Sequence, residues 1–142
     1  MEPHELDEVI DRIVAQDPRY AREAYDFMRE AVEFTQNAIR KANNNRPRHI
    51  TGQELLAGIR TYALEQYGPM ALMLFHEWGI YRCEDFGEIV FNLVDHGIFS
   101  KTESDRKEDF AGGYDFEEVF RKPFKPKQPA AGRPFPPGST SF

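Results

Sequence analysis

The sequence has a single cysteine, Cys83, and a single tryptophan among its 142 residues. One cysteine cannot form an intramolecular disulfide or supply the paired thiolates of a cysteine-based zinc finger. No apolar run approaches the roughly 20 residues of a transmembrane helix, and residues 1–5 are acidic where a signal peptide would be basic. These absences predict a cytoplasmic protein with no membrane segment.

Acidic residues are missing from the end of the chain. All 24 lie in residues 1–120, where 13 Lys and Arg give a balance of 13 − 24 = −11. The last 22 residues carry no acid and five cations, which are Arg121, Lys122, Lys125, Lys127 and Arg133. An acidic body repels a phosphate backbone, because nonspecific nucleic-acid affinity depends on cations. The charge distribution therefore disfavours nucleic acid as the partner.

Apolar residues recur at helical spacing in five segments, at 3–16, 19–42, 55–67, 70–78 and 84–96. Thr51 and Glu54 have the spacing of a capping box before the third segment, and Gly58 within it indicates close approach of another element. The fourth segment is almost wholly apolar and is expected at the buried centre. We therefore predict one mainly α domain over 1–121, a bundle of five to six helices. Residues 122–142 are rich in proline and glycine and are predicted to be disordered or extended.

The segment after the last long helix has a different pattern. Residues 98–101 and 110–116 fit two short strands around a charged turn, which predicts a small β-hairpin near 98–116. Three helices followed by such a hairpin are typical of a winged-helix domain, so a winged-helix-like arrangement over 51–120 stays an alternative. The third of these helices would then present Glu84, Asp85, Glu88 and Asp95 to a phosphate backbone, and this opposes DNA recognition.

Several short segments together resemble an uncharacterised bacterial family that is restricted to planctomycetes and verrucomicrobia. The likeness runs from about Tyr20 to Phe120 and includes 51–55, 58–60, 68–71, 78–80, 85–93 and 114–116. The segment 86–93, Phe-Gly-Glu-Ile-Val-Phe-Asn-Leu, is its most specific part. The resemblance implies one helical domain of a bacterial cytoplasmic protein. It brings no activity, cofactor or catalytic residue.

Cys83 is the candidate catalytic nucleophile, because it precedes a predicted helix whose N-terminus could lower the pKa of a thiol. The neighbouring Glu84 and Asp85 disfavour its thiolate, and no metal-ligand or phosphate-binding motif accompanies it. Arg60 and His76 lie on apolar helices, so both are candidate buried polar residues, with Glu77 or Asp85 as the carboxylate partner of Arg60. The prediction is therefore no catalytic residue, no cofactor and no metal. An enzyme or small-molecule binder with a pocket near Arg60, His76 and Cys83 is the alternative.

Two surfaces are left as candidates for protein contact. The first is the acidic face of helix 84–96 with an exposed aromatic residue, and its members are Glu84, Glu88, Phe91 and Asp95. The second is the basic tail, whose PxxP spacings fit polyproline recognition and whose cations include Lys125, Lys127 and Arg133. The leading hypothesis is a small non-enzymatic interaction or regulatory module that binds another protein or itself. A winged-helix nucleic-acid binder that uses the 40–49 loop and the tail is the third hypothesis.

Overall fold

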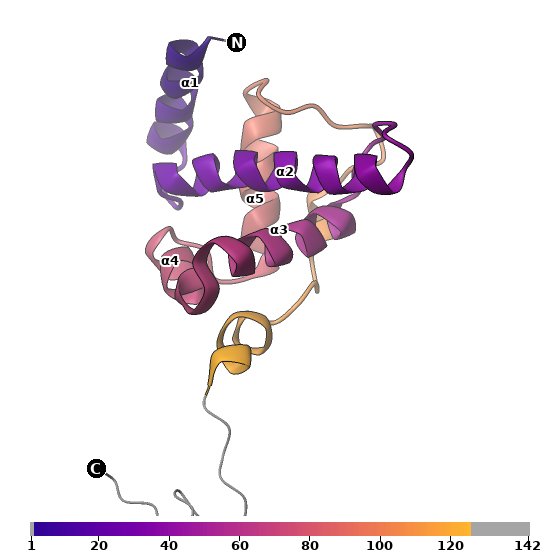
Figure 1. The fold of residues 1–142 in the computed structure, drawn as a ribbon. Helices are drawn as coiled ribbons and strands as arrows, with labels where there is room; N and C mark the ends of the chain where they lie inside the picture. Colours follow the sequence, from indigo (N-terminus) through magenta and orange to yellow (C-terminus); the bar gives the residue numbers. More distant parts are fainter. Residues whose placement is uncertain (1, 126–142) are drawn as a thin grey trace, which may run out of the picture.

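Helices α2 (Arg22–Ala42) and α3 (Gly52–Tyr67) form an antiparallel pair that is joined by the 43–51 connection (Figure 1). Helix α1 (Pro3–Gln16) precedes this pair, and α4 (Ala71–Glu77) and α5 (Cys83–Asp95) follow it. Helix α5 runs across α2 and α3 in Figure 1 and packs against both. The computed structural model describes residues 2–125, and helices are the only regular secondary structure in that part of the chain. The predicted mainly α fold is confirmed.

The helix ends follow local sequence signals. Thr51 and Glu54 form the predicted capping box, in which Thr51 Oγ1 accepts from the Glu54 amide at 3.1 Å and Glu54 Oε1 accepts from the Thr51 amide at 3.0 Å. Gly79 has φ +88°, and a Cβ atom built on it would lie 2.1 Å from the Arg19 carbonyl oxygen. Only glycine fits there without strain. The connection after α4 therefore packs directly on the connection between α1 and α2.

The aromatic core is centred on Phe75 of α4, which is fully buried. Its ring lies 5.2–5.7 Å from four other rings, a spacing at which edge-on and tilted contacts are favourable; these belong to Phe27, Phe86, Phe116 and Phe120. The prediction that helix 70–78 is the buried centre is thus right for Phe75. It is wrong for Met70 and Met73, which are 52% and 50% exposed.

The predicted β-hairpin near 98–116 is wrong, because no strand occurs in residues 2–125. The amides of Ile98 and Phe99 both donate to the Leu93 carbonyl, at 2.9 and 3.1 Å, and so fold the chain back on the end of α5. Further on, the carboxylates of Asp105 and Asp109 accept from backbone amides three residues before them, at 2.8 and 3.0 Å. Such side-chain bonds replace the backbone pairing of a strand. The segment contains a single 3-10 turn, η2 (Lys107–Phe110).

Three short turns complete the described chain. The 3-10 turn η1 (Gly68–Met70) leads into α4, and the π-helical turn η3 (Glu117–Arg121) continues into the 3-10 turn η4 (Lys122–Phe124). Val119 and Phe120 are buried, as predicted for a last helical turn over 115–121. The predicted extended tail from 122 is therefore wrong for 122–124, which η4 includes.

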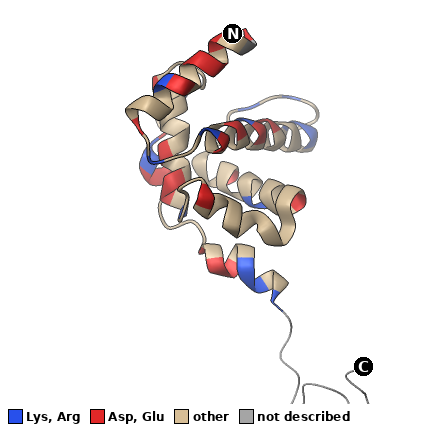
Figure 2. Ribbon diagram, turned by 90° about the vertical axis from the view of Figure 1, so that its left-hand side faces the viewer, with Lys and Arg blue, Asp and Glu red and all other residues tan. Residues whose placement is uncertain are grey.

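Charge is unevenly placed along the folded chain. Figure 2 shows acidic residues along α1, whereas Lys and Arg lie at the far end of α2. Arg40 and Lys41 occupy the last turn of α2, where the helix dipole favours cations. Arg46 and Arg48 follow on the exposed connection to α3. The acidic body therefore has one end that is locally basic.

Candidate functional site

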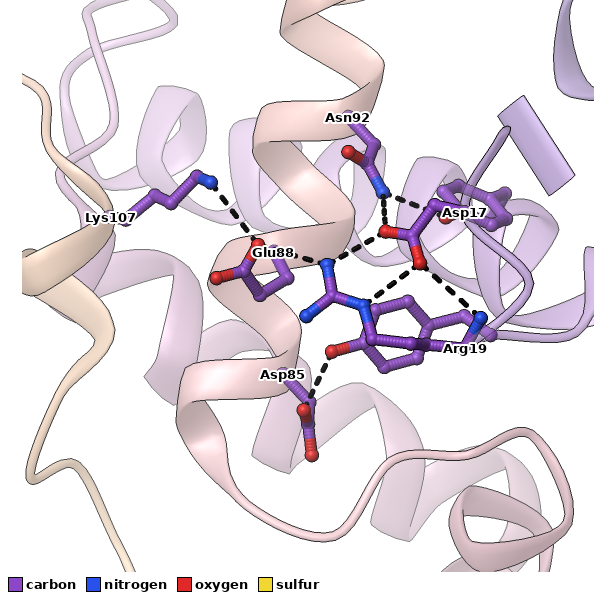
Figure 3. Close-up of polar contacts among 8 residues, drawn as sticks. Asp17, Arg19, Asp85, Glu88, Asn92 and Lys107 are labelled. Carbon is purple, nitrogen blue, oxygen red and sulfur yellow. Dashed lines mark hydrogen bonds and ion pairs between the residues drawn. The ribbon is translucent and has the colours of Figure 1, made fainter. Parts of the chain in front are cut away.

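The polar face of α5 meets the connection between α1 and α2 (Figure 3). Arg19 binds Asp17 through two nitrogens, at 2.8 and 2.7 Å, and its Nη2 also contacts Glu88 Oε2 at 3.2 Å. Lys107 of η2 approaches the same Glu88 oxygen at 3.2 Å. Asn92 Nδ2 donates to Asp17 Oδ2 at 2.9 Å. Glu88 is thus the acid of α5 that neutralises cations of the same chain within residues 2–125.

A second set of contacts fixes the start of α5. The hydroxyl of Tyr20 donates to Asp85 Oδ1 at 2.6 Å, and Asp85 Oδ2 accepts from the amides of Tyr81 and Arg82 at 2.8 and 3.3 Å. Tyr20 is 2% exposed, and burial, followed by the nearby Asp85, raises the pKa of its phenol well above the usual range. The hydroxyl therefore stays a donor. Neither Tyr20 nor Asp17 was singled out from the sequence, because both bonds join residues more than 60 positions apart.

The predicted contact surface on α5 is smaller in the structure. Glu84 and Asp95 are exposed, but the Glu88 side chain is only 29% exposed and lies between Arg19 and Lys107. Phe91 was predicted to be exposed; it is 9% exposed and belongs to the core. Exposure was the wrong alternative because the 98–110 segment packs on a second stripe of α5. Lys125 is exposed, and Lys127 and Arg133 lie outside the described residues.

The predicted buried polar residues are also placed differently. Arg60 is exposed, and no ion pair within residues 2–125 includes it. Its neighbour Ile59 is fully buried, so the one-residue step of about 100° turns Arg60 away from α2. His76 is half-buried and stacks on Tyr81, with ring centres 5.0 Å apart. Both predictions of burial are therefore corrected.

Cys83 lies in the interior, at 1% exposure. Its Sγ is 3.4 Å from both the amide nitrogen and the carbonyl oxygen of Tyr114, and burial raises the pKa of the thiol to about 11. A buried thiol with a raised pKa is a poor nucleophile. With Arg60 exposed on α3 and Cys83 enclosed, the residues of the alternative pocket do not line one cavity with His76.

The largest apolar side chains that are exposed lie at one end of the molecule. Met70, Met73 and Tyr81 are 52%, 50% and 61% exposed, and Phe124 is 43% exposed. A groove of about 680 Å³ runs here between α4 and the turns η3 and η4. Its lining residues are mainly apolar along the floor, with charged groups on both walls: Pro69, Leu72, Met73, His76, Glu77, Phe120, Arg121, Phe124 and Lys125. We call this the α4–η4 groove.

The winged-helix alternative is not supported by this geometry. Within residues 2–125 the wing is replaced by the turn η2, and the helix that would read DNA has its polar side against Asp17, Arg19 and Tyr25. A helix covered in this way cannot enter a major groove.

In the described chain no group of three or more His, Cys, Asp or Glu side chains is placed to hold a metal ion. None of its helices is both long and apolar enough to cross a membrane.

Comparisons with family models, curated proteins and solved structures give no match to this chain. The resemblance to the uncharacterised planctomycete and verrucomicrobial family, with the bacterial cytoplasmic setting that it implies, stays a prediction. The α4–η4 groove and the charged residues around it are therefore the features that bear on function.

Proposed function

We propose that the protein is a non-enzymatic protein-interaction module whose α4–η4 groove binds an amphipathic helix of a partner protein. The observation that carries this proposal is the exposure of Met73 and Phe124, at 50% and 43%, on the two sides of one groove. Methionine and aromatic residues are enriched where proteins bind each other. Unbranched methionine side chains also adapt to the shape of an incoming helix.

The exposed apolar side chains have no evident role in folding. Phe75, which does not line the groove, and Leu72, which is buried at its base, already anchor α4 in the core. Leaving Met70 and Met73 in water forfeits the roughly 1.5–3 kcal/mol that burial of such a side chain provides. Contiguous exposed apolar surface of this kind marks interaction sites. The groove therefore has the character of a docking surface.

The charges on the groove favour a polypeptide over a polyanion. Glu77 stands on the α4 wall, and Lys125 stands at the opposite wall beside Arg121, which is itself paired with Glu117 at 3.0 Å. A helix with charges of both signs beside its apolar stripe complements two walls of opposite sign, whereas a phosphate backbone requires walls of one sign. Lys125 also begins the basic, proline-rich segment predicted to dock partners, so the two candidate surfaces adjoin.

The test is affinity purification from cells that contain the native protein, followed by binding measurements with the purified partner. We expect Met73→Glu to weaken partner binding at least tenfold, because it places a charge among the apolar side chains that line the groove. Ala38→Glu is the matched control, since Ala38 is an exposed helical position on α2 outside the groove. A peptide that spans the amphipathic helix of the partner should compete with the whole partner.

Equal binding by the Met73→Glu and Ala38→Glu variants contradicts the proposal. Sedimentation of the purified chain gives a second check, because self-association that Met73→Glu abolishes would show that a second copy occupies the groove. Partner binding that is lost only when 126–142 are deleted would place the contact in the tail instead.

A further inference from the structure

A second cavity lies at the other end of the α2–α3 pair and shares no lining residue with the α4–η4 groove. It has a volume of about 300 Å³, the lower end of the range for small-molecule sites. Its walls are α2, α5, the end of the 43–51 connection and the segment 98–110. In Figure 1 the chain that leaves α5 arches across to the end of α2.

The interior of this cavity is apolar. Six of its lining side chains are apolar and half-buried in the folded chain; they are Val32, Ile50, Val90, Val94, Ile98 and Phe99. Leu55, Phe91 and Phe110 lie behind them in the core. An apolar group of a ligand therefore gains contacts here that water does not provide.

The mouth of the cavity carries three cations, Arg48, Lys101 and Arg106. The two carboxylates beside them already have partners: Asp105 binds His49 at 2.9 Å and the Thr102 amide at 2.8 Å, and Asp109 accepts from the Arg106 amide at 3.0 Å. Arg48 is paired with Glu54.

No ion pair within residues 2–125 includes Lys101 or Arg106. The Lys101 ammonium donates only to the Thr102 carbonyl, at 3.3 Å. Two cations at the mouth of an apolar cavity, on a chain with a net charge of −6, are thus available to an anion. We propose that this cavity binds a small amphipathic carboxylate, with its apolar body inside and its carboxylate between Lys101 and Arg106.

This proposal is independent of partner binding at the α4–η4 groove. The two basic side chains supply charge-assisted hydrogen bonds, and the apolar lining supplies the contact area. A neutral or cationic molecule with the same apolar body gains only the second contribution. Charge therefore decides which ligand is bound.

The experiment is a titration of the full chain, followed by NMR, with octanoate, octanol and octylammonium as probes. We expect octanoate to bind with shifts at Val90, Val94 and Phe99, octanol to bind at least tenfold more weakly, and octylammonium not to bind. The double variant Lys101→Gln/Arg106→Gln should weaken octanoate binding at least tenfold and remove its salt dependence. Arg12→Gln/Arg60→Gln is the matched control, because both arginines are exposed and lie outside the cavity.

Any of three results would overturn the proposal. If octanoate leaves the three reporter residues unshifted, the cavity is not its site. If octanol binds as tightly as octanoate, or if the double variant and its control bind octanoate equally, the cations do not recognise the carboxylate. All four substituted positions are solvent-facing or at the cavity mouth, so circular dichroism and melting curves should match the unmodified chain.

Discussion

Gly58 of α3 lies directly against the side chain of Thr35 of α2. A Cβ atom built on Gly58 would be 1.8 Å from Thr35 Oγ1 and 2.8 Å from its Cβ. Thr35 is 3% exposed, and its hydroxyl donates to the Ala31 carbonyl of the same helix at 2.8 Å. Its hydrogen bonding is thus satisfied within α2, and the contact with Gly58 is one of shape. It sets how closely the two helices of the central pair approach.

We predict that Gly58→Ala destabilises the protein. Overpacking a close contact costs about 1–3 kcal/mol, and alanine returns up to about 1 kcal/mol through its better helix propensity. Subtracting the full return leaves about 0–2 kcal/mol in the free energy of unfolding, and the 1.8 Å approach to Thr35 Oγ1 puts the expected loss at the upper end of this range. Urea denaturation followed by circular dichroism measures it.

The double variant Thr35→Ala/Gly58→Ala tests whether Thr35 is the cause. Thr35→Ala removes the closest atom, Oγ1, and also the methyl group. Gly58→Ala should therefore cost less stability in the Thr35→Ala background than in the unmodified chain. Strictly additive losses in the two single variants would contradict a contact of this kind.

The local features of the fold could be predicted from the sequence. The start of α1 at Pro3, the capping box at Thr51 and the end of α5 near Asp95 depend on residues within one or two turns of each other. Gly58 was also identified as a point of close approach, because glycine within a helix is costly unless space requires it. The apolar stripes gave the core side of α1, α2, α3 and α5, because helical spacing places their apolar residues on one face.

The long-range features could not be predicted. The burial of Phe91 and the exposure of Arg60 depend on which neighbours reach each helix face, and helical periodicity does not contain that information. Residues 98–101 and 110–116 fit two short strands in sequence, but the amides of Ile98 and Phe99 donate to the end of α5 instead. The hydrogen bond between Tyr20 and Asp85 joins residues 65 positions apart. The exposure of Met70 in η1 and of Met73 in α4 was missed because the segment 70–78 is almost wholly apolar and has no polar side to mark its surface.

We predict that Asp85→Asn destabilises the protein by about 1–3 kcal/mol, the cost of leaving a partly buried polar group unpaired. The Tyr20 hydroxyl and the Tyr81 amide donate to different oxygens of Asp85, and asparagine replaces one of these oxygens with an NH2 donor, so one of the two hydrogen bonds is lost. Thermal and urea denaturation measure the loss. Glu84→Gln, a substitution at the exposed preceding position, should change stability by less than about 0.5 kcal/mol. Similar effects for the two variants would show that Asp85 has no special role at the start of α5.

We predict that protonation of the Glu54 carboxylate contributes to the loss of folding stability in acid. Its carboxylate accepts from Arg48 at 2.9 and 2.5 Å and from the Thr51 amide, and these contacts lower the pKa from 4.5 to about 2. A carboxyl with a lowered pKa in the folded state stabilises it above the pKa of the unfolded chain. This contribution is full above about pH 4.5 and is lost as the pH falls toward 2.

Unfolding curves between pH 6 and pH 2 should therefore show a shallower loss of stability for Glu54→Gln than for the unmodified chain. Glu65→Gln is the control, because Glu65 is an exposed glutamate of the same helix and no ion pair within residues 2–125 includes it. Salt should weaken the difference, since Arg48 and Glu54 are solvent-accessible. If both variants have the same pH dependence, the Arg48–Glu54 pair does not contribute.

We predict that Cys83 does not react with a thiol reagent in the folded protein. The thiol is 1% exposed and has a pKa raised to about 11 by burial. At pH 8 such a thiol is ionised to about one part in a thousand, roughly 200-fold less than an ordinary cysteine. Access is restricted as well, because a Cβ atom built on Gly113 would lie only 2.9 Å from its Sγ.

The measurement is the rate of labelling by a chromogenic disulfide reagent at pH 8, with and without denaturant. Cys83 should be labelled at least about 100-fold more slowly in the folded chain than Cys at position 81 in a Tyr81→Cys/Cys83→Ser variant, because Tyr81 is 61% exposed. In denaturant both thiols should react at the same rate. Rapid labelling of Cys83 in the folded chain would mean that the contact between Cys83 and Tyr114 opens readily, and the alternative of a reactive cysteine would then replace its structural role.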